Sequence, residues 1–101
     1  MKFEIENTVY KRIVTDDIYK SVIAFANTSG GTIYVGVDDD GEAVGIEDID
    51  DVYTRLTYSV SEIIAHDVTM FTKHTLHDNG TISIEVAEGA SKSYYIKSNR
   101  V

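Results

Sequence analysis

The chain has no cysteine and no proline among its 101 residues. Without cysteine it cannot build a disulfide framework or use thiolate chemistry, and without proline it has no slow prolyl isomerisation step in folding. It also lacks an apolar run approaching the roughly 18 residues that a membrane span needs, and the first residues, MKFEIEN, do not read as a signal peptide. We therefore expect a cytoplasmic protein with no membrane partner.

Basic residues are scarce as well. Nine lysines and arginines face seventeen acidic residues, which gives a net charge of −8, and such a chain is repelled as a whole by phosphate. The imbalance is uneven: residues 1–67 carry a net charge of −9 and residues 68–101 a net charge of +1, and eight acidic residues lie within 38–51. The last third is therefore expected to present a neutral to basic surface.

The spacing of apolar residues predicts two helices. The first covers residues 16–28, capped by Thr15 or Asp16, and the second covers residues 50–66. In each of them the apolar residues recur at intervals of three and four, which is the spacing of a core-facing stripe. The first stripe consists of Ile18, Val22, Phe25 and Ala26, and the second of Val52, Leu56, Val60, Ile63 and Ile64.

Alternating apolar and polar residues, together with turn residues, predict the strands. Asp40-Gly41 and Asn79-Gly80 are typical of tight hairpin turns. The expected strands are residues 3–10, 32–37, 43–46, 68–76, 81–87 and 94–96. The order strand, helix, two strands, helix, then two or three strands predicts a single α+β domain, with two helices packed on a mixed, mainly antiparallel sheet.

The most distinctive stretch, residues 24–41, reads AFANTSGGTIYVGVDDDG. It joins the end of a helix to a strand through a double glycine. This stretch resembles the Schlafen/AlbA-type DNA-binding domain, found at the N-terminus of many bacterial proteins classed as transcriptional regulators, some of which are also labelled divergent AAA-type ATP-binding proteins. The turn residues that carry the resemblance are Asn27, Thr28, Gly30, Gly31, Gly36, Asp38 and Gly41.

The chain departs from the family pattern at both ends. Glu4 and Tyr10-Lys11 match the first strand of the pattern, but Val9 stands where the family has a glutamate. Near the C-terminus, Ser93-Tyr94-Tyr95 lacks the usual proline, and residue 101 comes before the family's last strand. We therefore expect this domain to be the N-terminal part of a longer protein, without its last strand; the alternative is a degenerate short member of the family.

The enzyme alternatives are not favoured. The resemblance to Schlafen-type RNases implies three carboxylates around a divalent cation; Glu4 and Asp38 could supply two, and Val9 removes the third. The aspartates at 38–40 lack calcium-loop spacing and suit a solvated hairpin tip. No lysine follows Gly30-Gly31 as in a phosphate-binding loop, so these glycines suit a helix end better than a phosphate site. We expect no catalytic residue, metal or cofactor.

The resemblance thus implies the DNA-binding domain of a bacterial transcriptional regulator. Two alternatives stay open: a protein-interaction or dimerisation module without nucleic-acid binding, which the acidic balance favours, and a degenerate metal-dependent nuclease or nucleotide-binding domain. Small sheet domains that read DNA commonly work in pairs, so a homodimer is expected. Three histidines, His66, His74 and His77, are expected at the surface, and the tyrosines in packing. The candidate phosphate contacts are Lys11, Arg12, Lys73, Lys92, Lys97 and Arg100.

Overall fold

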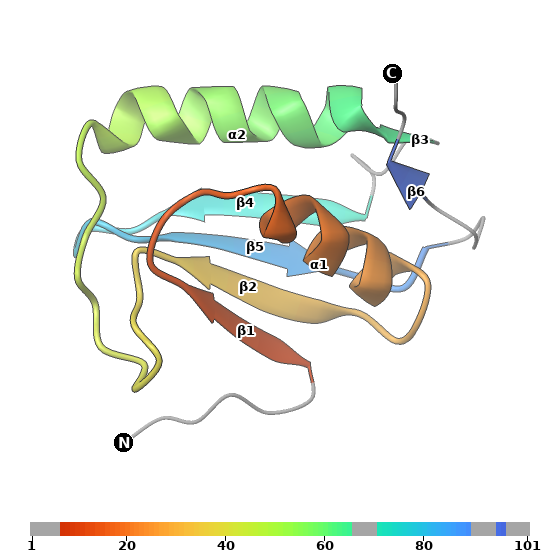
Figure 1. Ribbon diagram of the computed structural model, residues 1–101, viewed down its shortest axis with the longest axis horizontal. Coiled ribbons are helices and arrows are strands. Elements are labelled where there is room, and N and C mark those ends of the chain that lie inside the picture. Colours follow the sequence, from red (N-terminus) through yellow and green to blue (C-terminus); the bar gives the residue numbers. More distant parts are fainter. Residues whose placement is uncertain (1–6, 66–70, 90–94, 97–101) are drawn as a thin grey trace.

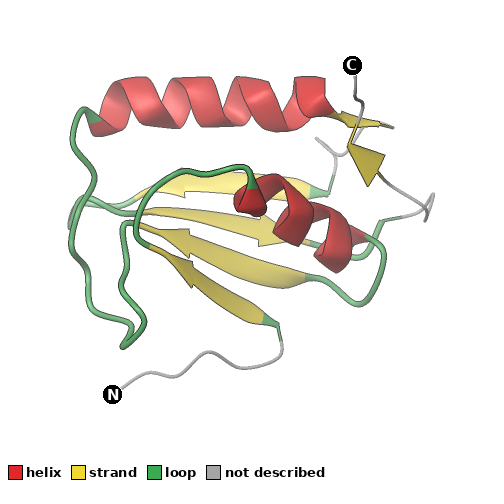
Figure 2. Cartoon of the chain, in the orientation of Figure 1, coloured by secondary structure: helices red, strands yellow, loops and turns green. Residues whose placement is uncertain are grey.

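The computed structural model describes residues 7–65, 71–89 and 95–96. Two helices lie on one side of a four-stranded sheet, and two short strands pair separately beside them (Figures 1 and 2). None of the helices in the described ranges is long and apolar enough to cross a bilayer. The elements are β1 (Thr8–Lys11), α1 (Asp17–Ala26), β2 (Gly31–Val35), α2 (Ile49–Ile63), β3 (Ile64–Ala65), β4 (Thr72–Leu76), β5 (Ile82–Val86) and β6 (Tyr95–Ile96).

The strand order in the main sheet is β1-β2-β5-β4. β1 and β2 run parallel and are joined through α1, as a parallel pair requires a crossover. β5 runs antiparallel to both of its neighbours, β2 and β4. The sheet is therefore mixed, and the predicted α+β class, with two helices on a mixed and mainly antiparallel sheet, is confirmed.

The core lies between the helices and the centre of the sheet. Ile33 of β2 and Ile84 of β5 are directly paired across the strands, and neither has any exposed surface. The first predicted helix stripe and the part of the second up to Val60 face these strands, as their spacing requires, whereas Ile64 of the second stripe lies in β3. From α1 the core takes Ile18, Val22, Phe25 and Ala26, and from α2 it takes Leu56 and Val60, with Val52 packed at the margin.

The double glycine forms a tight junction between α1 and β2. The N–H of Gly30 donates to the carbonyl of Phe25 at 2.9 Å, and Gly30 has φ +90°, which side-chain-bearing residues rarely adopt. A Cβ on Gly31 would lie 2.6 Å from the Phe25 ring. The junction therefore requires glycine at both positions: one for its backbone conformation and one for close packing.

Both hairpin turns contain three residues rather than the two expected. In the first, Asp38 N–H donates to the Glu42 carbonyl at 2.9 Å, and Gly41 N–H donates to the Asp38 carbonyl at 2.9 Å. His77, Gly80 and Thr81 repeat this pattern in the second. The expected strand at 43–46 is wrong: an isolated bridge from Val37 to Ala43 stands in its place, because Gly36, at φ +88°, turns the chain out of the sheet.

Several boundaries also differ. Asp16 is the N-cap residue of α1, as expected, but its side chain makes no capping hydrogen bond. The first turn has the backbone bonds from Ile18 N–H to the Thr15 carbonyl and from Tyr19 N–H to the Asp16 carbonyl. α2 ends at Ile63, and β3 begins in place of its last expected turn. The last expected strand is present as β6, but it pairs with β3 and not with the main sheet. The expected strand residues 3–6, 68–70 and 94, and the helix residue His66, lie outside the described ranges.

His74 is half-buried, so the expectation of a surface histidine is wrong at this position. It lies opposite Ile84 on the helix-covered side of the sheet, and its Nε2 has no hydrogen-bond partner within the described part of the chain. Burial disfavours the charged ring and lowers the pKa of His74 below its ordinary value of 6.5.

A comparison of two glycine substitutions tests the junction. Gly30→Ala and Gly45→Ala both put a side chain at a positive φ, which costs about 1 kcal/mol. Only at residue 30 does the new Cβ also meet a backbone oxygen, that of Val86 at 2.6 Å, whereas nothing lies within 4 Å of it at residue 45. We expect Gly30→Ala to lower the unfolding free energy by about 1–3 kcal/mol more than Gly45→Ala in chemical denaturation. Equal losses would contradict this account.

The pH dependence of stability tests the burial of His74. Because its pKa is lower in the folded chain, the unfolded chain binds a proton first as the pH falls below about 6.5, and the unfolding free energy decreases. His74→Leu removes this proton and the unpartnered nitrogen. We expect denaturation at several pH values between about 5 and 7.5 to give a smaller loss for the variant than for the natural chain. Identical slopes would show that His74 titrates normally.

Candidate nucleic-acid interface

The side of the sheet away from the helices is polar. Two rows of paired residues cross it, and six of the eight carry a hydroxyl group. One row consists of Thr8, Thr32, Glu85 and Lys73, and the other of Tyr10, Tyr34, Ser83 and Thr75. In the second row Tyr10 and Ser83 are buried, whereas in the first Lys73 and Glu85 are exposed. The first row is therefore the more accessible one.

This accessible row ends in a shallow cleft beside the double glycine, which we call the polar cleft. The cleft has a volume of about 470 Å³, and its lining includes Lys73, Glu85 and three residues whose side chains can donate hydrogen bonds, Asn7, Ser29 and Thr32. Gly30 and Gly31 form part of its wall. The structure thus brings the predicted residue Lys73 to the predicted Gly30-Gly31 pair, which lies more than forty positions earlier in the sequence.

The remaining turn residues stabilise local structure. The Thr28 hydroxyl donates to the Ala24 carbonyl at 2.7 Å in the last turn of α1, where Asn27 is the C-terminal cap. Gly30 uses its N–H inside the junction, so this group is not offered to a phosphate. The reading of the double glycine as a helix end therefore agrees with its hydrogen bonds.

The Asp38 side chain makes its hydrogen bonds within its own turn. Its Oδ1 accepts from the N–H groups of Asp40 and Glu42, at 2.9 and 3.0 Å, and its Oδ2 lies 3.9 Å from Arg12 Nη2. No group of three or more metal-ligating side chains occurs within the ranges described. Glu4, the other carboxylate of the expected pair, lies outside those ranges, and Val9 packs against the core.

The predicted cations do not form one patch. Lys11 and Arg12 lie at the end of β1, in line with Leu76 at the far end of β4, whereas Lys73 lies near the start of β4. Since β1 and β4 are opposite edges of the sheet, the two groups occupy different corners. Lys92, Lys97 and Arg100 fall outside the described ranges.

Sequence reasoning missed the polar partners of Lys73. Nothing in the sequence was a reason to select the other polar residues of the cleft lining, because threonine, serine and asparagine are common on any surface. These residues are Asn7, Ser29, Thr32 and Thr72. A usable signal was present: strand alternation places Thr32 on the side opposite Ile33 and Val35, and Lys73 on the side opposite His74. What alternation alone could not give is the pairing of the strands.

Comparisons with known proteins identify the family. The family model described as Schlafen, AlbA_2 matches residues 2–101. The fold is similar to the N-terminal domain of a Nitrosomonas europaea protein named as related to the ATP-dependent DNA helicase RecG, with a TM-score of 0.62 and 22% identity, covering 94% of this chain and 71% of that one.

It is also similar to the DIP2311 protein from Corynebacterium diphtheriae, with a TM-score of 0.61 and 20% identity, covering 94% of this chain and 20% of that one. At these identities the likeness shows the fold alone, and this chain spans only a fifth of the second protein. No curated protein matches the sequence. The match of the family model over residues 2–101 confirms the resemblance, and the chain belongs to the Schlafen AlbA_2 family.

Proposed function

We propose that this domain binds the phosphate backbone of nucleic acid at the polar cleft. The observation that carries the proposal is that Lys73 lines one cleft with three neutral residues able to donate hydrogen bonds, Asn7, Ser29 and Thr32, beside the double-glycine turn. Lysine, serine, threonine and asparagine are the side chains that commonly contact phosphate oxygens. Family membership and the similarity to a RecG-related protein also support nucleic-acid binding.

Charge limits the strength of this binding. The chain carries −8 overall, and Glu85 lies directly opposite Lys73 in the strand pair. A phosphate at the cleft therefore gains from one ammonium group and is opposed by one carboxylate. We expect contacts with one or two phosphates, weak at physiological salt and without base-specific recognition.

The finer role, as the DNA-binding domain of a bacterial transcriptional regulator, belongs to the same proposal and rests on the family resemblance. The homodimer also stays a prediction. The last described strand, β6, pairs with β3 and so gives no reason for pairing with a second copy. The remaining reason is that one small cleft offers few contacts. Light scattering that gives a mass near 11.2 kDa at every concentration would refute the pair.

Binding rather than hydrolysis is the function we propose. Asp38, the candidate metal ligand within the described residues, stabilises its turn with one oxygen and lies near Arg12 with the other. Val9 is apolar and packs against the core. A divalent cation would have to displace these contacts before it could activate water.

A salt series with charge variants tests the proposed binding. Lys73→Gln should weaken binding to a short DNA and make the slope of log K against log salt shallower by about 1. Glu85→Gln should strengthen binding by removing the opposing carboxylate. Lys20→Gln is the matched control: Lys20 is an exposed lysine on α1, on the other side of the sheet. We expect it to leave both the affinity and the slope unchanged.

The binding proposal fails if the chain binds neither single-stranded nor duplex DNA at low salt. It also fails if Lys20→Gln and Lys73→Gln weaken binding equally, since binding would then follow net charge alone. Either result would favour the protein-interaction alternative.

Incubation of RNA and DNA with the chain and magnesium or manganese tests the enzyme alternative. We expect no cleavage above background, because Asp38 is held by its turn. Cleavage that Asp38→Ala abolishes, while Asp39→Ala in the same turn leaves it intact, would reverse this conclusion.

A further inference from the structure

A second and larger cleft lies on the opposite side of the sheet, between α2 and the segment that joins β1 to α1. It has a volume of about 790 Å³, within the usual range for ligand sites. We call it the helical cleft. Its apolar lining consists of Ile13, Val14, Tyr19, Ile46, Val52 and Leu56.

Two large side chains on its rim are unusually exposed. Ile13 and Tyr58 each expose 66% of their surface, the highest values among the exposed large apolar residues of the described chain. One comes from the segment after β1 and the other from α2, so they flank the cleft from separate elements. Exposed apolar groups around a cleft mark interaction sites, and tyrosine is a frequent anchor in them.

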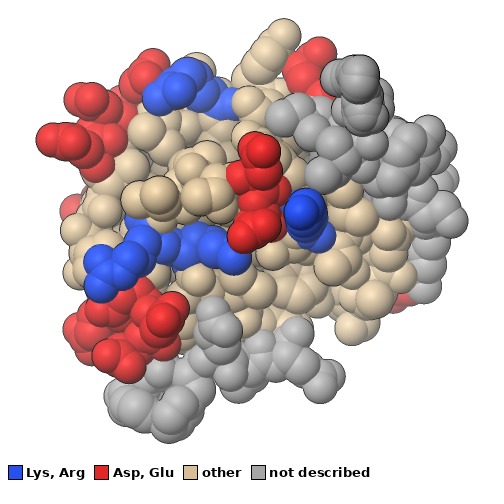
Figure 3. All heavy atoms as spheres, in the orientation of Figure 1, with Lys and Arg blue, Asp and Glu red and all other residues tan. Residues whose placement is uncertain are grey.

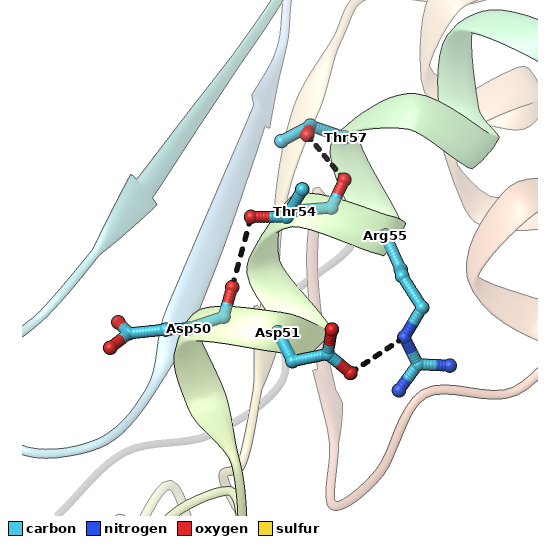
Figure 4. Close-up of polar contacts among 5 residues, drawn as sticks. All are labelled: Asp50, Asp51, Thr54, Arg55 and Thr57. Atoms are coloured by element: carbon cyan, nitrogen blue, oxygen red, sulfur yellow. Dashed lines mark hydrogen bonds and ion pairs between the residues drawn. The ribbon is translucent and has the colours of Figure 1, made fainter.

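Two arginines, Arg12 and Arg55, also line the helical cleft, and each has guanidinium N–H groups available to bind a ligand. Arg55 donates through Nε to Asp51 at 3.0 Å (Figure 4), and its two terminal nitrogens make no hydrogen bond within the described part of the chain. Arg12 lies 3.9 Å from Asp38, beyond hydrogen-bond distance. Their side chains expose 70% and 65% of their surface. Each guanidinium can therefore still donate two hydrogen bonds to one carboxylate.

We propose that the helical cleft binds a short peptide segment that carries one or two carboxylates beside large apolar side chains. The apolar side chains would pack between Ile13 and Tyr58, and a carboxylate would bind Arg12 or Arg55. This peptide site is on the side of the sheet opposite the polar cleft and does not depend on the proposed nucleic-acid binding.

The charges around the cleft favour such a segment over a polyanion. Glu47 lines the cleft, and Asp38 and Asp51 lie beside the arginines. Figure 3 shows acidic atoms gathered over the loop between β2 and α2 and over the start of α2, with basic atoms close to both groups. These carboxylates would repel a row of phosphates, which extends beyond the arginines. A segment with only one or two carboxylates can bind the arginines without lying next to the acidic groups.

Selection of a displayed library of random 12-residue peptides against the intact chain tests the proposal. The enriched peptides should contain aspartate or glutamate next to leucine, phenylalanine or tryptophan. Their affinity should fall about tenfold or more for the Arg12→Gln/Arg55→Gln variant. The matched control, Lys20→Gln/Lys73→Gln, removes the same charge elsewhere and should bind as the natural chain does.

Tyr58→Ala provides an independent variant on an exposed helical position and should also weaken the enriched peptides. The proposal is overturned if no peptide is enriched, if the enriched peptides lack acidic residues, or if both double variants lose affinity equally. It is also overturned if Arg12→Gln/Arg55→Gln abolishes binding to an oligonucleotide, which would assign the cleft to nucleic acid. A Tyr58→Ala variant that converts a dimer into a monomer would assign it to a second copy.

Discussion

The close approach of α1 to the start of β2 is the constraint on which the rest of this structure depends. The Phe25 ring lies where any side chain at residue 31 would have to be, and the Val86 carbonyl lies where one at residue 30 would be. Because only residues 27–30 separate α1 from β2, the helix packs closely on the sheet, and its buried stripe shares one core with Ile33 and Ile84. The same junction sets Ser29 and Thr32 beside Lys73, which completes the polar cleft.

The sheet separates two surfaces of different chemistry. On the helix side, apolar residues fill the core and continue into a cleft with two arginines. On the other side, hydroxyl-bearing residues dominate, with one lysine facing one glutamate. A net charge of −8 repels anions from most of the surface. The few exposed lysines and arginines therefore determine where an anion can bind.

Local patterns predicted most of the fold. The helix stripes and the positions of both hairpin turns follow from residue spacing and turn chemistry, and the structure confirms them. The strand expected at 32–37 is present as β2, at Gly31–Val35. The family resemblance supplied what spacing could not, the identity of the domain. Sequence patterns gave the wrong result where tertiary packing decides. His74 is half-buried because β4 pairs with β5, and residues 43–46 leave the sheet because Gly36 turns the chain. The polar cleft depends on strand pairing, so Lys73 was found by charge alone and its neighbours were not.

Amide chemical shifts recorded while a short oligonucleotide is added test the central claim most directly, because they report position as well as binding. The account predicts that shifts concentrate at Gly31, Thr32 and Lys73, and that the amides of Ile13 and Tyr58 in the helical cleft stay unchanged. Shifts centred on the helical cleft, or the absence of any shift at low salt, would contradict it.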